Sequence, residues 1–455
     1  MTDRKVESLQ RSISWIRIAL PLSVAVLIGL QYLQTFAITA ESTASSSLAS
    51  QQWANHPPAF PLETLSGAVY APLAASPLAA FDAGDGPWLG TSLWLQLGRL
   101  ARSQDQLGYD YFASGRHVGL TAATFMQLAI PVLAVILCWQ LRDRIRESQF
   151  STWATLLLHL IELCGPAITI GCLLTAVLSW RILGVDGAIR LILILAVYLL
   201  YSVAAGGICW FAFRHARDKS VAILSLSLFW LFNFTLARPA TVNLAAAIYP
   251  LPTLDSFARK IDFETRSGYN GVESRRDRER RFVSEALLDY KAKSIDEIPV
   301  NLSAILLQKE ERHQREVFVR RVGELRSQFD RQEQLEQYAS LLMPYVGIQI
   351  ASSALAATDF ASEREQLAHA DLYWDRVVKK VYDDVVQSSG IEGKKVLRGP
   401  DYWQQFPFIV PTLPSPAHSL ASCLIPASGL TLWAAAGIVL VSLRRSPELL
   451  AEEHS

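Results

Sequence analysis

The stretch "LRDRIRESQF" (residues 141–150) places five charged residues between two long apolar segments. Residues 118–141 precede it without a single charged side chain, and residues 156–178 follow it with His159 and Glu162 as their strongly polar side chains. A helix needs about 20 predominantly apolar residues to cross the hydrocarbon core of a bilayer. Both flanking segments meet that length, so the charged stretch is expected to be a short link between two membrane-spanning helices.

The composition of the whole chain agrees with a membrane protein. The 455 residues are 51% hydrophobic with a mean hydropathy of +0.22, which is too apolar for an ordinary soluble enzyme. The 42 basic and 42 acidic side chains balance, so no attraction for nucleic acid is expected and the lipid bilayer is the expected partner. We predict an all-α polytopic membrane protein whose six transmembrane helices are residues 18–40, 118–141, 154–179, 190–213, 220–237 and 419–443.

Lysine and arginine in short links concentrate on the cytoplasmic side of a membrane. Six spans place four basic segments on one side, which is therefore assigned to the cytoplasm together with both chain ends, residues 1–17 as an interfacial helix and residues 444–455 as a tail. The opposite short link offers only Arg181 and Arg190. The basic residues of the four segments are Arg4, Lys5, Arg11 and Arg17; Arg142, Arg144 and Arg146; Arg214, Arg217 and Lys219; and Arg444 and Arg445.

Two extracytoplasmic insertions follow from this orientation, residues 41–117 and residues 238–418. In the larger one, Phe318, Val322, Leu325 and Phe329 recur at four- and three-residue intervals, which predicts a helical domain with an apolar seam. Its charge run "ESRRDRERR" (residues 273–281) is either an anion site or a solvated helix face, and the interleaved acidic residues favour the latter.

Two local features of the chain have competing interpretations. Asn301 opens a glycosylation sequon, but we expect it to cap the helix that begins at Leu302. His159 and Glu162 lie three residues apart on one helix face, so they form either a polar spot at a transport path or helix contact, or a pair that satisfies itself.

Motifs for catalysis are missing from the sequence. It contains no G-x-x-x-x-G-K-[ST] loop for nucleotide phosphates, no H-E-x-x-H, no G-x-S-x-G and no Cys/His cluster with metal-ligand spacing. We therefore expect neither enzyme activity nor a bound cofactor or metal in this chain.

Several short motifs resemble one known family. They are "FDAGDGPWLG" (residues 81–90), "MQLAIPVLAVIL" (residues 126–137), "YPLP" (residues 249–252), "GYNG" (residues 268–271), "IPVN" (residues 298–301), "LLMPYVGIQIASSALAATDF" (residues 341–360), His369 and "DLYWDRV" (residues 371–377). In their order and spacing they resemble the permease subunit of type 2 ABC exporters. The similarity is to the subgroup related to the nitrous-oxide-reductase and multicopper-enzyme maturation permeases, which has a large outer domain before its last helix.

The resemblance implies a bacterial inner-membrane exporter subunit driven by a separate dimer of ABC ATPase subunits, which hold the ATP and Mg²⁺. The link "LRDRIRESQF" is then a coupling helix (residues 142–153) that contacts the ATPase. Its expected ATPase-coupling residues are Arg142, Arg144, Arg146, Glu147 and Phe150.

This sequence departs from the family pattern at two places. Gln149 and Phe150 stand where the family has Gly-Thr, and Gln96 and Gly98 stand where it often has Glu and His. These departures suit one half of an unequal pair, with a non-identical second permease chain as partner. A mechanotransmission or scaffold protein that acts on periplasmic partners, and a polytopic membrane enzyme, stay open as alternatives.

Overall fold

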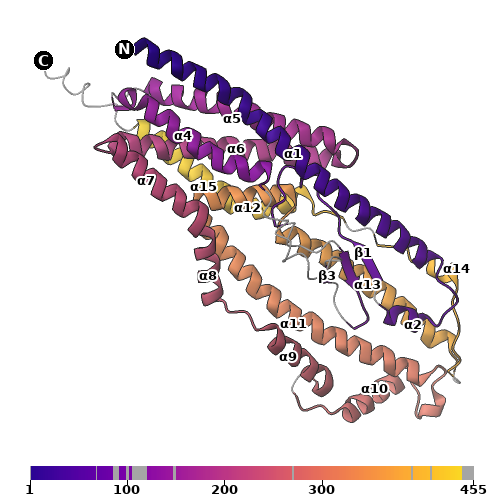
Figure 1. Cartoon of the computed structure of the whole chain (residues 1–455). Coiled ribbons are helices and arrows are strands. Elements are labelled where there is room, and N and C mark those ends of the chain that lie inside the picture. The colour runs from indigo at the N-terminus through magenta and orange to yellow at the C-terminus, as the bar shows by residue number, and fades with distance from the viewer. Residues whose placement is uncertain are drawn as a thin grey trace.

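The computed structural model describes residues 2–67, 69–85, 92–98, 102–104, 120–146, 150–268, 271–390, 393–409 and 412–442. The described chain is mostly helical and elongated, with a bundle at one end and a second lobe at the other (Figure 1). Helix α1 begins and helix α15 ends at the same end of the bundle (Figure 1).

Six helical segments of the described residues are long and apolar enough to cross a membrane, which confirms the predicted number. Four of them lie in α1 (Thr2–Ala54), α4 (Ala122–Arg146), α5 (Phe150–Leu178) and α6 (Trp180–His215). The fifth combines α7 (Lys219–Leu231), a π-helical turn (Phe232–Ala237) and α8 (Arg238–Ile248), and the sixth lies in α15 (Pro416–Ser442). The chain is therefore a multi-pass membrane protein by the length and composition of its helices.

Glycine allows two membrane helices to approach closely. A Cβ atom added to Gly207 of α6 would lie 2.9 Å from the Cα atom of Gly437 in α15. A Cβ atom added to Gly437 would likewise lie 2.9 Å from the Cα atom of Gly207. Small residues at facing positions are a common basis of helix packing within membranes, because lipid provides little hydrophobic driving force between helices. The backbones of α6 and α15 therefore touch at this point.

A short helix, α12 (Pro344–Ala356), packs inside the membrane bundle. Its residues Tyr345, Ile348 and Leu355 belong to the same buried core as α4, α5 and α6. The helix lies within residues 238–418, which we assigned to the second insertion, but its apolar side chains pack against the spanning helices. Thirteen residues are too few to cross a bilayer, so surrounding helices cover this one.

The second lobe, called the distal lobe below, has its own core. It contains α2 (Pro61–Ser66), α9 (Leu254–Ser267), α10 (Arg275–Asp289), α11 (Leu302–Ser340), α13 (Phe360–Ser388), α14 (Pro400–Trp403) and a short 3₁₀ turn (Ile295–Glu297). It also contains an antiparallel sheet in the order β1 (Val69–Pro72), β2 (Ser92–Leu95), β3 (Arg102–Gln104). Trp94 pairs with Tyr70 on one side and with Arg102 on the other. Sequence patterning did not predict this sheet.

Helix α1 connects the two cores. Its 53 residues correspond to about 80 Å of continuous helix. At its far end Trp53 is 6% exposed, donates through Nε1 to the main-chain oxygen of Phe406 (3.0 Å) and packs edge-on against Trp403 (4.9 Å between ring centroids). The Ser- and Thr-rich segment after the first span therefore continues the helix into the distal lobe.

Helix α11 begins as expected and packs differently from expectation. The side chain of Asn301 accepts hydrogen bonds from the main-chain nitrogens of Ser303 (2.9 Å) and Ala304 (3.4 Å), which confirms the predicted cap. The predicted apolar seam is only partly covered, because Phe329 is 42% exposed. Long polar side chains join α11 to α13, as in the ion pair between Arg315 and Asp375 (2.8 Å).

Candidate functional site

The charged stretch lies where α4 ends and α5 begins. Arg142 is 9% exposed, and its Nη2 donates to the main-chain oxygen of Arg217 (2.9 Å), in the link between α6 and α7. Of the other expected coupling residues, Glu147 lies outside the described residues, and the side chains of Arg144, Arg146 and Phe150 are not described. Arg142 is therefore committed to a contact within the protein.

A second arginine makes the reciprocal contact. Nη1 of Arg214, in the last turn of α6, donates to the main-chain oxygen of Ile145 (3.0 Å), in the last turn of α4. The last carbonyl groups of a helix have no partner in their own helix, and an arginine is a favourable donor for them. Two hydrogen bonds thus cross in opposite directions between the α4–α5 link and the α6–α7 link.

Aromatic packing between α5 and α6 stabilises the end of the bundle where the two links lie. Trp153 in the first turn of α5 packs edge-on against Trp210 of α6, with ring centroids 6.2 Å apart. Both side chains are almost fully buried, and the Trp153 ring also lies 3.6 Å from the position of a Cβ atom on Gly207. Helices α5 and α6 are therefore held together directly beside the two links.

The predicted polar pair on the third span is divided between two contacts. Glu162 forms an ion pair with Arg17 of α1 (2.7 Å), and the two side chains are 51% and 46% exposed. His159 bonds through Nδ1 to the main-chain oxygen of Thr155 on its own helix (2.7 Å). Glu162 thus makes a contact between two helices, one of the interpretations that the sequence left open.

A buried chain of hydrogen bonds links the first insertion to the bundle. Nε2 of Gln127 donates to the hydroxyl of Tyr198 (3.0 Å), which bonds to the hydroxyl of Ser352 (3.3 Å). Ser352 donates to a carboxylate oxygen of Asp82, and the main-chain nitrogen of Gly84 donates to the other (2.9 Å). Burial raises the pKa of Asp82, although its two hydrogen bonds act in the opposite direction.

This network was not predicted as a site, yet a signal for it was present. Asp82, Gln127 and Ser352 each belong to a different one of the short motifs that carry the family resemblance. Side chains far apart in sequence meet here because α12 folds back into the bundle beside α6. An ion pair between Arg238 and Asp85 (3.3 Å) lies next to the network.

Arg190 fixes the entry to the last helix. It is 4% exposed and donates to the main-chain oxygen of Leu355 (3.0 Å) at the end of α12 and to the hydroxyl of Ser419 (2.7 Å) in α15. A further bond joins it to the main-chain oxygen of Pro414. The residue that we counted as an outer-loop charge therefore ties α6, α12 and α15 together.

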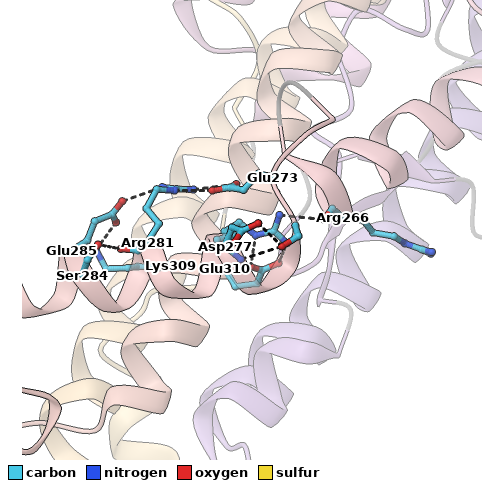
Figure 2. Close-up of polar contacts among 10 residues, drawn as sticks. Arg266, Glu273, Asp277, Arg281, Ser284, Glu285, Lys309 and Glu310 are labelled. Carbon is cyan, nitrogen blue, oxygen red and sulfur yellow. Dashed lines mark hydrogen bonds and ion pairs between the residues drawn. The ribbon is translucent and has the colours of Figure 1, made fainter.

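The charge run of α10 is part of the packing between α10 and α11 (Figure 2). Arg278 is 2% exposed and forms a two-pronged ion pair with Glu310 of α11, at 3.0 and 3.2 Å. Arg281 bonds to both Glu273 (2.9 Å) and Glu285 (3.0 Å). The solvated-face interpretation holds for exposed members of the run, whereas Arg278 is a buried structural residue and not an available anion ligand.

Within the part of the chain that the structure describes, no group of three or more His, Cys, Asp or Glu side chains is placed to hold a metal ion. All five cysteines are buried and unpaired. The two arginines of the described site, Arg142 and Arg214, hold helix ends together.

Comparisons with known proteins add one finding. A family model described as "Domain of unknown function (DUF3526)" matches residues 260–405, which include most of the distal lobe together with α12. Neither the curated proteins nor the solved structures contain a match to this chain. The similarity found therefore concerns a domain of unknown function and covers about a third of the sequence.

Proposed function

We propose that this chain is the membrane-spanning permease subunit of an ABC exporter in the bacterial inner membrane. The proposal rests on the motifs that resemble type 2 exporter permeases and on the lack of a nucleotide-binding loop in the sequence, so that the energy must come from a separate ATPase. The structural observation that supports it most is at the end of the bundle that carries the two links. There, Arg142 and Arg214 connect the charged α4–α5 link to the α6–α7 link.

In this proposal a dimer of ATPase subunits holds ATP and Mg²⁺ and presses on the α4–α5 link from the cytoplasm. The end of α4 and the start of α5, which meet at this link, would fit a groove on the partner protein. Closure of the ATPase dimer would then tilt α4 and α5 as nearly rigid bodies. The second permease chain is a non-identical sibling, and both ends of this chain face the cytoplasm.

A second candidate function is mechanotransmission without conduction of a substrate. The continuous helix α1 favours it, because α1 runs from the bundle into the aromatic core of the distal lobe and ends there at the buried Trp53. A motion at the bundle would reach a partner of the distal lobe through such a rod. A polytopic membrane enzyme is a third reading, which no described side-chain cluster favours.

Purification of the full-length tagged chain in mild detergent tests the proposal. Recovery of a P-loop ATPase supports the first two functions and counts against the enzyme. If no ATPase co-purifies and Arg146→Glu leaves cellular function intact, the proposal loses its basis. A structure of the complex distinguishes the first two functions, since a continuous cavity between the permease chains supports conduction and a closed interface supports transmission.

A further inference from the structure

The α4–α5 link and the α6–α7 link are joined by two arginine side chains, one from α4 and one from α6. Arg142 extends from α4 to the main-chain oxygen of Arg217, while Arg214 extends from α6 to the main-chain oxygen of Ile145. Through this pair of contacts, each helix end donates one hydrogen bond and accepts one. Rotation or sliding of α4 against α6 breaks both contacts at once.

The surroundings make this contact stiff. Arg142 is 9% exposed, and Ile145 and Phe213 are fully buried in the same core, so the core side of this part-buried contact is closed to water. Breaking a hydrogen bond to a charged group away from water leaves the donor unsatisfied, which is strongly unfavourable. The acceptors are main-chain oxygens, so the side chain at position 217 is not needed for them.

The α6–α7 link opens directly into the fifth span. Helix α7 starts at Lys219 and continues through the π-helical turn into α8. Helix α8 lies beside α11 of the distal lobe (Figure 1), and the main-chain oxygen of Tyr249 just after α8 accepts a hydrogen bond from Gln332 of α11 (2.7 Å). The α6–α7 link is thus connected to the distal lobe through one continuous helical column.

We infer that Arg142 and Arg214 are positioning residues that lock the α4–α5 and α6–α7 links into one body, so that a push on the first link moves α7 as well. The inference rests on the proposed function for the source of the push. It also reassigns Arg142, which we first expected to contact the ATPase, to a contact within the chain.

Pairwise distance measurements between spin labels test the inference in the complex with its co-purified ATPase. Leu48 of α1 is the reference position, Leu158 reports on α5 and Ser220 reports on α7; all three side chains are exposed and are replaced by cysteine for labelling. The native cysteines are buried, which limits background labelling. Each pair is measured before and after a non-hydrolysable ATP analogue is added.

In the otherwise native chain, nucleotide is expected to shift both the 48–158 and the 48–220 distances. In the double variant Arg142→Met and Arg214→Met the shift at 220 is lost while the shift at 158 remains. The corresponding lysine variants retain one donor each and restore part of the shift. Arg181→Met, which removes an exposed arginine at the other end of the bundle, leaves both shifts unchanged.

Persistence of the shift at 220 in the double variant overturns the inference, as does a bound ATPase that moves position 158 but never 220 in the native chain. If the double variant aggregates, the single variant Arg214→Met replaces it and the same loss is expected.

Failure of the proposed function gives a different result, because then no ATPase is captured by the native chain. The lock is still tested in the isolated protein by amide hydrogen exchange. Residues 216–220 are expected to exchange faster in the methionine variants than in the lysine variants, and equal exchange rates contradict the lock.

Discussion

Substitution of Gly207 by alanine should weaken the bundle more than the added methyl group suggests. The new Cβ atom would lie 2.9 Å from the Cα atom of Gly437 and 3.7 Å from its nitrogen. Two carbon atoms are in optimal contact at about 3.5–4.0 Å, so α6 and α15 have to separate locally by about 1 Å. Both neighbours are main-chain atoms, which a change of rotamer cannot move.

The expected cost is about 1–3 kcal/mol of folding stability, the range found when extra methyl groups are forced into packed cores. Gly437→Ala should cost a similar amount, because its Cβ atom meets the Cα atom of Gly207 at the same distance. Thermal unfolding in detergent, followed by the fluorescence of tryptophan residues or by retention of the monodisperse elution peak, measures both changes.

Gly165→Ala provides the matched control in α5. Its Cβ atom would meet only a side-chain atom of Ile161, at the ordinary contact distance of 3.7 Å. Because both alanines improve helix propensity equally, the difference between the two variants isolates the contact between α6 and α15. Equal unfolding temperatures for Gly207→Ala and Gly165→Ala would refute the close approach of these helices.

Three further predictions concern the distal lobe. Glu264→Gln should destabilise the distal lobe by about 3 kcal/mol at neutral pH. Hydrogen bonds from Arg321 lower the pKa of Glu264, so this stabilisation is present above pH 4.5 and is lost as the pH falls through the lower pKa of the folded protein. Unfolding measured against pH should therefore show the stabilities of the two proteins converging in acid. Gly323→Ala, on α11 with no atom within 4 Å of its Cβ position, should stabilise by about 0.5–1 kcal/mol in denaturant unfolding; a loss of stability would contradict the open environment. Trp53→Ala should cost about 3–5 kcal/mol and expose the end of α1 to limited proteolysis, and a protected α1 would show that the Phe406 contact is dispensable.

Hydropathy was sufficient to find the membrane-spanning helices because each of them must be apolar over its whole length. Hydropathy did not identify α12 as part of the bundle. The sequence "YVGIQIASSALAA" is apolar, but its 13 residues are too few for a membrane-spanning helix. Its place became evident only from tertiary contacts, which periodicity does not encode.

The sequence predicted the position of the α4–α5 link between two spanning helices, but not the contacts of its side chains. The charge pattern marked the α4–α5 link, but no pattern shows that Arg142 is turned inward to the oxygen of Arg217. Asp82 and Ser352 likewise occur 270 residues apart, and only the return of α12 brings them together. Main-chain acceptors and long-range pairs leave no periodic trace in a single sequence.

The proposed contact between the α4–α5 link and an ATPase can be measured directly. A photo-crosslinking amino acid at Phe150 of the full-length chain in native membranes is predicted to capture a P-loop ATPase, whereas the same probe at the exposed Trp180 of α6 captures none. Capture of the ATPase at position 180 alone, or an equal yield at both positions, would contradict the account.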